Sequence, residues 1–60
     1  MKNFEVHYLT GYGIAVTGYV SPDLKTLVEG LEEEPFLNDI VCIKDEASGQ
    51  IYADILRKEG

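Results

Sequence analysis

The chain has 60 residues, of which 11 are acidic and five are basic, so its formal net charge at pH 7 is −6. A chain of this length forms one domain and buries only about 60% of its unfolded surface. We therefore expect a single domain over residues 1–60 with a thin core. The negative balance disfavours phosphate backbones and anionic membranes, which are bound through clustered Lys and Arg.

The cysteine content points to a compartment. Cys42 is the only cysteine, so no disulfide can form within the chain. A lone thiol suits a reducing environment better than a secreted, disulfide-bonded scaffold. No apolar run approaches the roughly 20 residues that span a bilayer, and no signal peptide opens the chain. These features predict a cytoplasmic protein with no membrane contact, and nothing in the sequence indicates a cofactor.

Two strands are predicted at the start. Residues 2–9 alternate in polarity, with Phe4, Val6 and Tyr8 on one face. Residues 10–13 carry two glycines and predict a tight turn, so the next run forms a hairpin with the first. That next run, residues 14–20, separates its aliphatic side chains from the rest: Ile14, Val16 and Val20 against Ala15, Thr17 and Tyr19.

Residues 21–35 predict one amphipathic helix. Four aliphatic side chains recur at the spacing that places them on one helical face: Leu24, Leu27, Val28 and Leu31. We expect Ser21 to cap the first free amides and Pro22 to occupy the first helical position. Pro35 stops the helix at its other end, unless it ends one turn earlier with Gly30 as its cap.

Two further strands follow the helix. Residues 40–44 are apolar on both faces, which predicts an inner strand. Residues 45–49 form a polar turn with Gly49 in a left-handed position, and residues 50–56 form the last strand. The order predicts an α+β fold of ββαββ type: a four-stranded antiparallel sheet of two hairpins, with the helix packed on one face. A small half-open β-barrel with a short helix is the alternative.

This arrangement divides the side chains into a core and a second sheet face. The predicted core contains Phe4, Val6, Tyr8, Ile14, Val16, Val20, Leu24, Leu27, Val28, Leu31, Ile51, Ala53 and Ile55, with one face of the third strand. The second face is then expected to carry His7, Leu9, Ala15, Thr17, Tyr19, Tyr52 and Leu56. Tyrosine suits contact surfaces, so we interpret this face as an interaction surface. A homodimer through Tyr19 and Tyr52 would offset the thin core.

An acidic cluster ends the predicted helix: Glu29, Glu32, Glu33 and Glu34. Carboxylates at this end oppose the helix dipole, each at a cost of about 0.3–1 kcal/mol at low salt. A solvated acidic end is the structural explanation, and a patch offered to a basic protein is the functional one. Tyr12, at the tip of the first hairpin, is a further candidate contact residue.

The sequence offers little to support chemistry. Cys42 and His7 are the only thiol and imidazole, and a catalytic pair needs contact and a third group that orients the base. Structural zinc requires four ligands at recognisable spacing, and the acidic stretch lacks the pattern of a calcium loop. Gly11 and Gly13 precede a strand, whereas a dinucleotide fingerprint opens a helix. No catalytic or metal site is predicted.

Several functional hypotheses remain. The first is a non-enzymatic protein-interaction module that presents Glu29, Glu32, Glu33, Glu34, Tyr12, Tyr19 and Tyr52 to a protein partner with a basic surface. The alternative is an acidic inhibitor that mimics nucleic acid in the basic groove of a nucleic-acid enzyme. A cysteine-dependent enzyme and a nucleic-acid binder that stacks bases on the tyrosine face rank lower.

Overall fold

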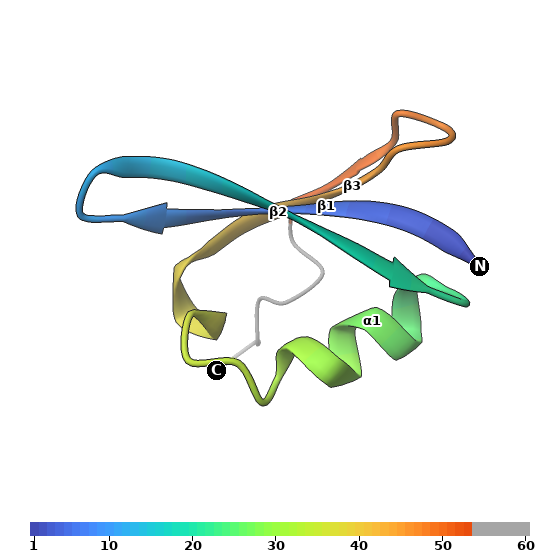
Figure 1. The fold of residues 1–60 in the computed structure, drawn as a ribbon, viewed down its shortest axis with the longest axis horizontal. Coiled ribbons are helices and arrows are strands. Elements are labelled where there is room, and N and C mark those ends of the chain that lie inside the picture. Colours follow the sequence, from blue (N-terminus) through green and yellow to red (C-terminus); the bar gives the residue numbers. More distant parts are fainter. Residues whose placement is uncertain (54–60) are drawn as a thin grey trace.

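The structure is a computed structural model and describes residues 1–53. Its elements are β1 (Lys2–Thr10), β2 (Gly13–Ser21), α1 (Leu24–Leu31), a 3-10 turn η1 (Leu37–Asp39), β3 (Ile40–Asp45) and β4 (Ile51–Tyr52). The strands form one open antiparallel sheet in the order β2-β1-β3-β4, and α1 lies across one face (Figure 1). The predicted α+β fold is confirmed. The alternative, a small half-open β-barrel, is wrong because the sheet is open.

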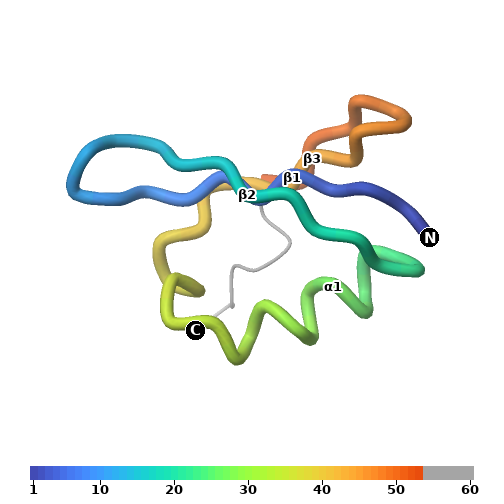
Figure 2. The backbone as a smooth tube through the Cα atoms, viewed as in Figure 1, coloured from blue at the N-terminus to red at the C-terminus, as the bar shows by residue number. Residues whose placement is uncertain are grey.

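The chain keeps to one side of the sheet between β2 and β3. It leaves β2, runs through α1 and η1 on that side, and returns as β3 (Figure 2). β3 pairs with both β1 and β4, which confirms its inner position. Within residues 1–53, no helix is both long and apolar enough to cross a membrane.

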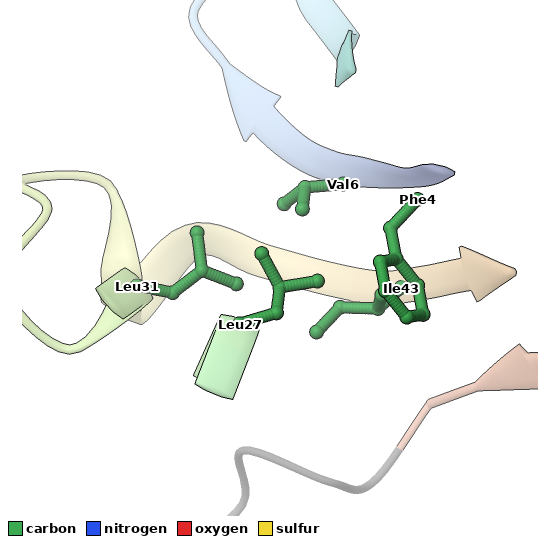
Figure 3. Close-up of a cluster of buried hydrophobic side chains, with 5 residues drawn as sticks. All are labelled: Phe4, Val6, Leu27, Leu31 and Ile43. Carbon is green, nitrogen blue, oxygen red and sulfur yellow. The ribbon is translucent and has the colours of Figure 1, made fainter. Parts of the chain in front are cut away.

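Among residues 1–53, five buried apolar side chains form the core. They come from β1, α1 and β3 and point toward one another (Figure 3): Phe4, Val6, Leu27, Leu31 and Ile43. Half-buried side chains pack around them, including Leu24 and Val28 of α1. The ring of Phe36 also contacts Tyr8, with a centroid distance of 4.3 Å. The helical face and the β1 face of the predicted core are therefore confirmed.

The contribution of β2 to the core was predicted with the wrong face. In the register, Phe4 pairs with Tyr19 and Val6 pairs with Thr17. Directly paired residues share a face, so Tyr19 and Thr17 lie on the side of α1. The aliphatic residues Ile14, Val16 and Val20 lie on the opposite side and are exposed.

The first hairpin turn sets this register. Thr10 pairs with Gly13, so only Gly11 and Tyr12 lie between the two strands. The Thr10 hydroxyl donates to the Gly13 carbonyl at 2.7 Å and accepts from the Tyr12 amide at 3.1 Å. Gly13 takes a φ of 118°, which L side chains rarely adopt. A two-residue connection of this kind fixes which side chains of β2 face the helix.

The start of α1 differs from the prediction. Asp23 is the N-cap, and its carboxylate accepts a hydrogen bond from the Thr26 amide at 2.8 Å. Ser21 instead ends β2 and is buried, with its hydroxyl donating to the Asp23 carbonyl at 2.9 Å. Pro22 therefore precedes the helix. Aspartate stabilises the helix further at this position because its negative charge matches the positive end of the helix dipole.

The end of α1 also differs. Gly30 lies inside the helix, so the expectation that it caps the helix is wrong, and Glu32 is the C-cap. Residues 33 and 34 continue in tight turns, with the Glu33 amide bonded to the Gly30 carbonyl and the Glu34 amide to the Leu31 carbonyl. The helix thus stops before Pro35 is reached.

The second hairpin is tied together by Asp45. Its side chain accepts from the Ala47 amide at 3.0 Å, and its carbonyl accepts from the Gly49 amide at 2.7 Å. Gly49 has a φ of 77°, as predicted from the turn. β4 is shorter than predicted, because Ala53 already leaves the strand. Ile55 and Leu56, placed in the predicted core and second face, lie outside the described residues.

Candidate interaction surfaces

The sheet face turned away from α1, here called the outer face, is apolar. Five aliphatic side chains of this face are each 54–62% exposed: Leu9, Ile14, Val16, Val20 and Ile51. Among residues 1–53, no element covers it (Figure 1). Exposed aliphatic groups gathered on one sheet face mark an interaction surface more often than single exposed side chains do.

A short polar strip crosses the centre of the outer face. Glu5 pairs with Lys44 across β1 and β3, and His7 pairs with Cys42 in the same way. The His7 ring nitrogen Nε2 lies 3.3 Å from Glu5 Oε1. Cys42 and His7 are therefore cross-strand neighbours on the same face, and the imidazole contacts a carboxylate. Proximity of His7 and Cys42 was not implied by the sequence, and the register of β1 against β3 creates it.

The tyrosines do not form the predicted face. Tyr19 lies on the side of α1 and packs half-buried against the core. Tyr52 pairs with the buried Ile43, which places it on the same side. Tyr12 stands fully exposed at the hairpin tip, as predicted. The expected second face with Tyr19 and Tyr52 is therefore wrong. The first hairpin turns the faces of β2 over, and the pairing of β4 with β3 does the same for Tyr52 and for Ile51, which was predicted in the core and is exposed.

A groove runs between β2 and α1. Its walls include Tyr19 and Ser21 from β2, Thr26, Leu27 and Gly30 from α1, and Glu34 from the turn that follows. Gly30 leaves space along it, since a Cβ at that position would meet no atom within 4 Å. Two of the predicted contact residues, Tyr19 and Glu34, meet here although they are distant in the sequence.

The two side chains also interact through charge. Burial raises the pKa of the Tyr19 phenol, and the negative charge of Glu34 raises it further, with a smaller contribution from Tyr8. A nearby carboxylate disfavours the phenolate, so the phenol stays protonated and can donate a hydrogen bond. The groove therefore combines an apolar floor with one acceptor-only carboxylate and the hydroxyl groups of Tyr19, Ser21 and Thr26.

The groove lies beside an open edge of the sheet. Within residues 1–53, β2 pairs only with β1, so its nine residues leave one row of backbone groups free for another strand. The remaining predicted carboxylates, Glu29, Glu32 and Glu33, are exposed near the same end of α1. They do not line the groove.

The sequence could have revealed the outer face but not the groove. A two-residue turn between residues 10 and 13 pairs Leu9 with Ile14. This register places the aliphatic side chains of β2 on the sheet face that does not carry Val6. The groove depends on how α1 crosses β2, which no local pattern reports. Among the described residues, no group of three or more His, Cys, Asp or Glu side chains is arranged to hold a metal ion.

Comparisons with protein-family models, with curated proteins and with solved structures gave no match to this chain.

Proposed function

We propose that this protein is a non-enzymatic protein-interaction module that binds an extended, basic segment of a partner along the edge of β2. The observation that carries the proposal is the groove in which Tyr19 and Glu34 meet, directly beside that edge. The segment would add a strand to the sheet through backbone hydrogen bonds. Its alternate side chains would enter the groove, which is how strand addition achieves specificity.

The chemistry of the groove selects the partner. Leu27 and Leu31 provide an apolar floor, and Glu34 offers a carboxylate to a Lys or Arg side chain of the segment. Charge-assisted hydrogen bonds of this kind are stronger than neutral ones. The net charge of −6 favours approach of a cationic partner and disfavours nucleic acid. Cytoplasmic residence is part of the proposal and is supported by the single cysteine.

A displayed library of random ten-residue peptides tests this function. We expect enrichment of sequences in which Lys or Arg alternates with apolar residues. Binding of a selected peptide should weaken at least about tenfold in Glu34→Gln, since a charged hydrogen bond is worth about 1.5–3 kcal/mol. Glu46→Gln, an exposed carboxylate in the β3–β4 turn, is the matched control and should bind normally. Equal affinity of both variants would disprove the role of the groove.

The alternative function, an acidic mimic of nucleic acid, predicts a different salt response. A mimic that displaces counterions over a wide basic groove binds with a steep dependence on salt. Strand addition keeps most of its affinity, because only Glu34 and the neighbouring carboxylates sense the salt. Affinity for an immobilised basic nucleic-acid enzyme, measured at low and high salt, separates the two functions.

One observation favours a second candidate function, a cysteine-dependent enzyme. His7 faces Cys42 across the sheet and contacts Glu5 at 3.3 Å, which is the order of groups that activates a thiol. The candidate ranks lower because the groove of this structure lies on the other side of the sheet, away from these residues. Alkylation of Cys42 across a pH series decides it, since an activated thiol reacts well below pH 8 and an ordinary one does not.

A further inference from the structure

We infer that a second copy of this chain covers the outer face, forming a symmetric dimer in which two sheets pack face to face. The inference is independent of the groove, which lies on the other side of the sheet. It starts from the balance of apolar groups. Among residues 1–53, the core buries five apolar side chains, and the outer face exposes as many aliphatic ones. Packed sheets with such inner faces form the core of β-sandwiches.

Charge identifies the occupant. The chain carries a net charge of −6, but the described strand residues of the outer face include one acid, Glu5, and one permanent base, Lys44. Among residues 1–53, most acidic residues lie between β2 and β3, in the segment that runs on the α1 side of the sheet (Figure 2). A second copy can therefore approach here without direct repulsion. This face carries almost no excess negative charge, so it would not attract a basic partner.

The sheet order supplies the symmetry. In the order β2-β1-β3-β4, the centre lies between β1 and β3. A two-fold axis that runs along this centre, between the two sheets, places β1 of one copy over β3 of the other. Because Glu5 pairs with Lys44 at the same level, Glu5 of each copy then faces Lys44 of its partner. The same operation places β2, with Val16 and Val20, over the β4 side. Such an interface is self-complementary.

The size of the face predicts a weak dimer. With about 3.3 Å per residue and about 4.8 Å between strands, the four strands present a projected area on the order of 400 Å². Stable interfaces bury about 800 Å² of accessible surface per partner. We therefore expect a dissociation constant in the micromolar range, so the dimer is visible at about 10–1,000 μM protein.

Two measurements on the unmodified chain test the inference. Sedimentation equilibrium should show a reversible monomer–dimer equilibrium in this concentration range. Cys42 serves as a reporter, because it is half-buried at the centre of the outer face. Its alkylation rate should fall severalfold as the dimer forms. A monomer at every concentration would overturn the inference, and so would a dimer whose Cys42 reacts as fast as that of the monomer.

Matched variants locate the interface. Val16→Glu adds a negative charge to the outer face and should abolish the dimer. Ala47→Glu adds the same charge to an exposed turn and should leave it intact. Circular dichroism checks that both variants fold. Both should also bind a groove-selected basic peptide like the unmodified chain, so a failure of the dimer is distinguishable from a failure of the proposed function.

A mixing experiment tests the symmetry axis. The E5K chain alone places two bases opposite each other across the axis, and the K44E chain alone places two acids there. Each should dimerise at least tenfold more weakly than the unmodified chain. Mixing the two restores opposite charges at both contacts and should yield a heterodimer. Because the pairing inside each chain stays like-charged, rescue on mixing reports contacts between copies. Without rescue, this axis is wrong.

Discussion

Tyr19 and Glu34 line the same groove, and the charge of the Glu34 carboxylate helps to raise the pKa of the Tyr19 phenol. Tyr19 belongs to β2 and Glu34 to the turn after α1, so the pair relates the sheet to the end of the helical segment. This groove is the one proposed to bind a partner. A titration of Tyr19 therefore reports directly on how this end of the groove is assembled.

The first prediction concerns this pair. Glu34→Gln should lower the pKa of Tyr19, because the neutral amide no longer disfavours the phenolate. The pKa should remain above its ordinary value, since burial makes the largest contribution. Ultraviolet absorbance titration measures the change, with Tyr19→Phe identifying the Tyr19 component. Glu46→Gln should leave the titration unchanged, and an equal response in that control would contradict the contact.

The second prediction concerns the cap of α1. Hydrogen bonds from Thr26 hold the pKa of Asp23 below the ordinary range. The ionised cap is therefore favoured in the folded state, and its contribution to stability is present above about pH 3.9, the ordinary pKa of aspartate. It is lost as the pH falls through the lowered pKa. Urea unfolding between pH 2 and pH 7 should show this loss.

Asp23→Asn provides the control for the cap. Asparagine caps a helix about as well as aspartate but does not titrate in this range. The variant should lose less stability on acidification than the unmodified chain. An identical acid response in both proteins would show that the Asp23 carboxylate has no part in it.

The third prediction concerns the core. Leu31 is almost completely buried against Phe4 and Val6. Leu31→Ala should lower the free energy of unfolding by about 2–5 kcal/mol. A domain of this size has only about 3–9 kcal/mol in total, so the variant should be partly unfolded at 37 °C. Val16→Ala, on the exposed outer face, is the comparison and should cost much less to the monomer under dilute conditions.

The fourth prediction separates two glycines. Gly30 is helical and has open space around its Cβ position, so Gly30→Ala should stabilise the chain by about 1 kcal/mol. Gly13 has a φ of 118°, so Gly13→Ala should destabilise it. Thermal unfolding measures both changes. The added methyl group in Gly30→Ala also enters the groove, and we expect it to weaken peptide binding while stability rises.

The fifth prediction concerns the carboxylates after the helix. Replacement of Glu32, Glu33 and Glu34 with glutamine should leave the fold intact or raise the melting temperature slightly, because negative charge near a helix C-terminus is unfavourable. Their side chains are exposed, so no packing is lost. Circular dichroism and thermal unfolding test this outcome. An unfolded triple variant would show that these residues hold the structure together.

Local patterns predicted most of the fold. The alternation around Phe4 and Val6 and the helical spacing of Leu27 and Leu31 lead directly to the observed core, because each pattern encodes one buried face. The inner position of β3 followed from its apolar character on both sides. Gly49 followed from the chemistry of its turn.

The faces of β2 could not be assigned from β2 alone. Its aliphatic residues suggested burial, but the pairing of Thr10 with Gly13 places them outside. Polarity alternation reports that a strand has two different faces, and only the register reports which face meets the helix. The position of Tyr19 and Glu34 in one groove could not be predicted for another reason. It depends on the crossing of α1 over the sheet, a tertiary relationship with no local signature.

The length of the connection at Gly11 and Tyr12 therefore decides which face of β2 meets the helix. Side chains alternate with a period of two, so one inserted residue in this turn would exchange the sides of β2. Ile14 and Val16 would then enter the interior, and Tyr19 would leave the groove for the opposite surface. Insertion of a single codon at this hairpin would therefore bury the aliphatic side chains that β2 now exposes. It would remove the surface proposed for dimerisation without replacing any existing residue.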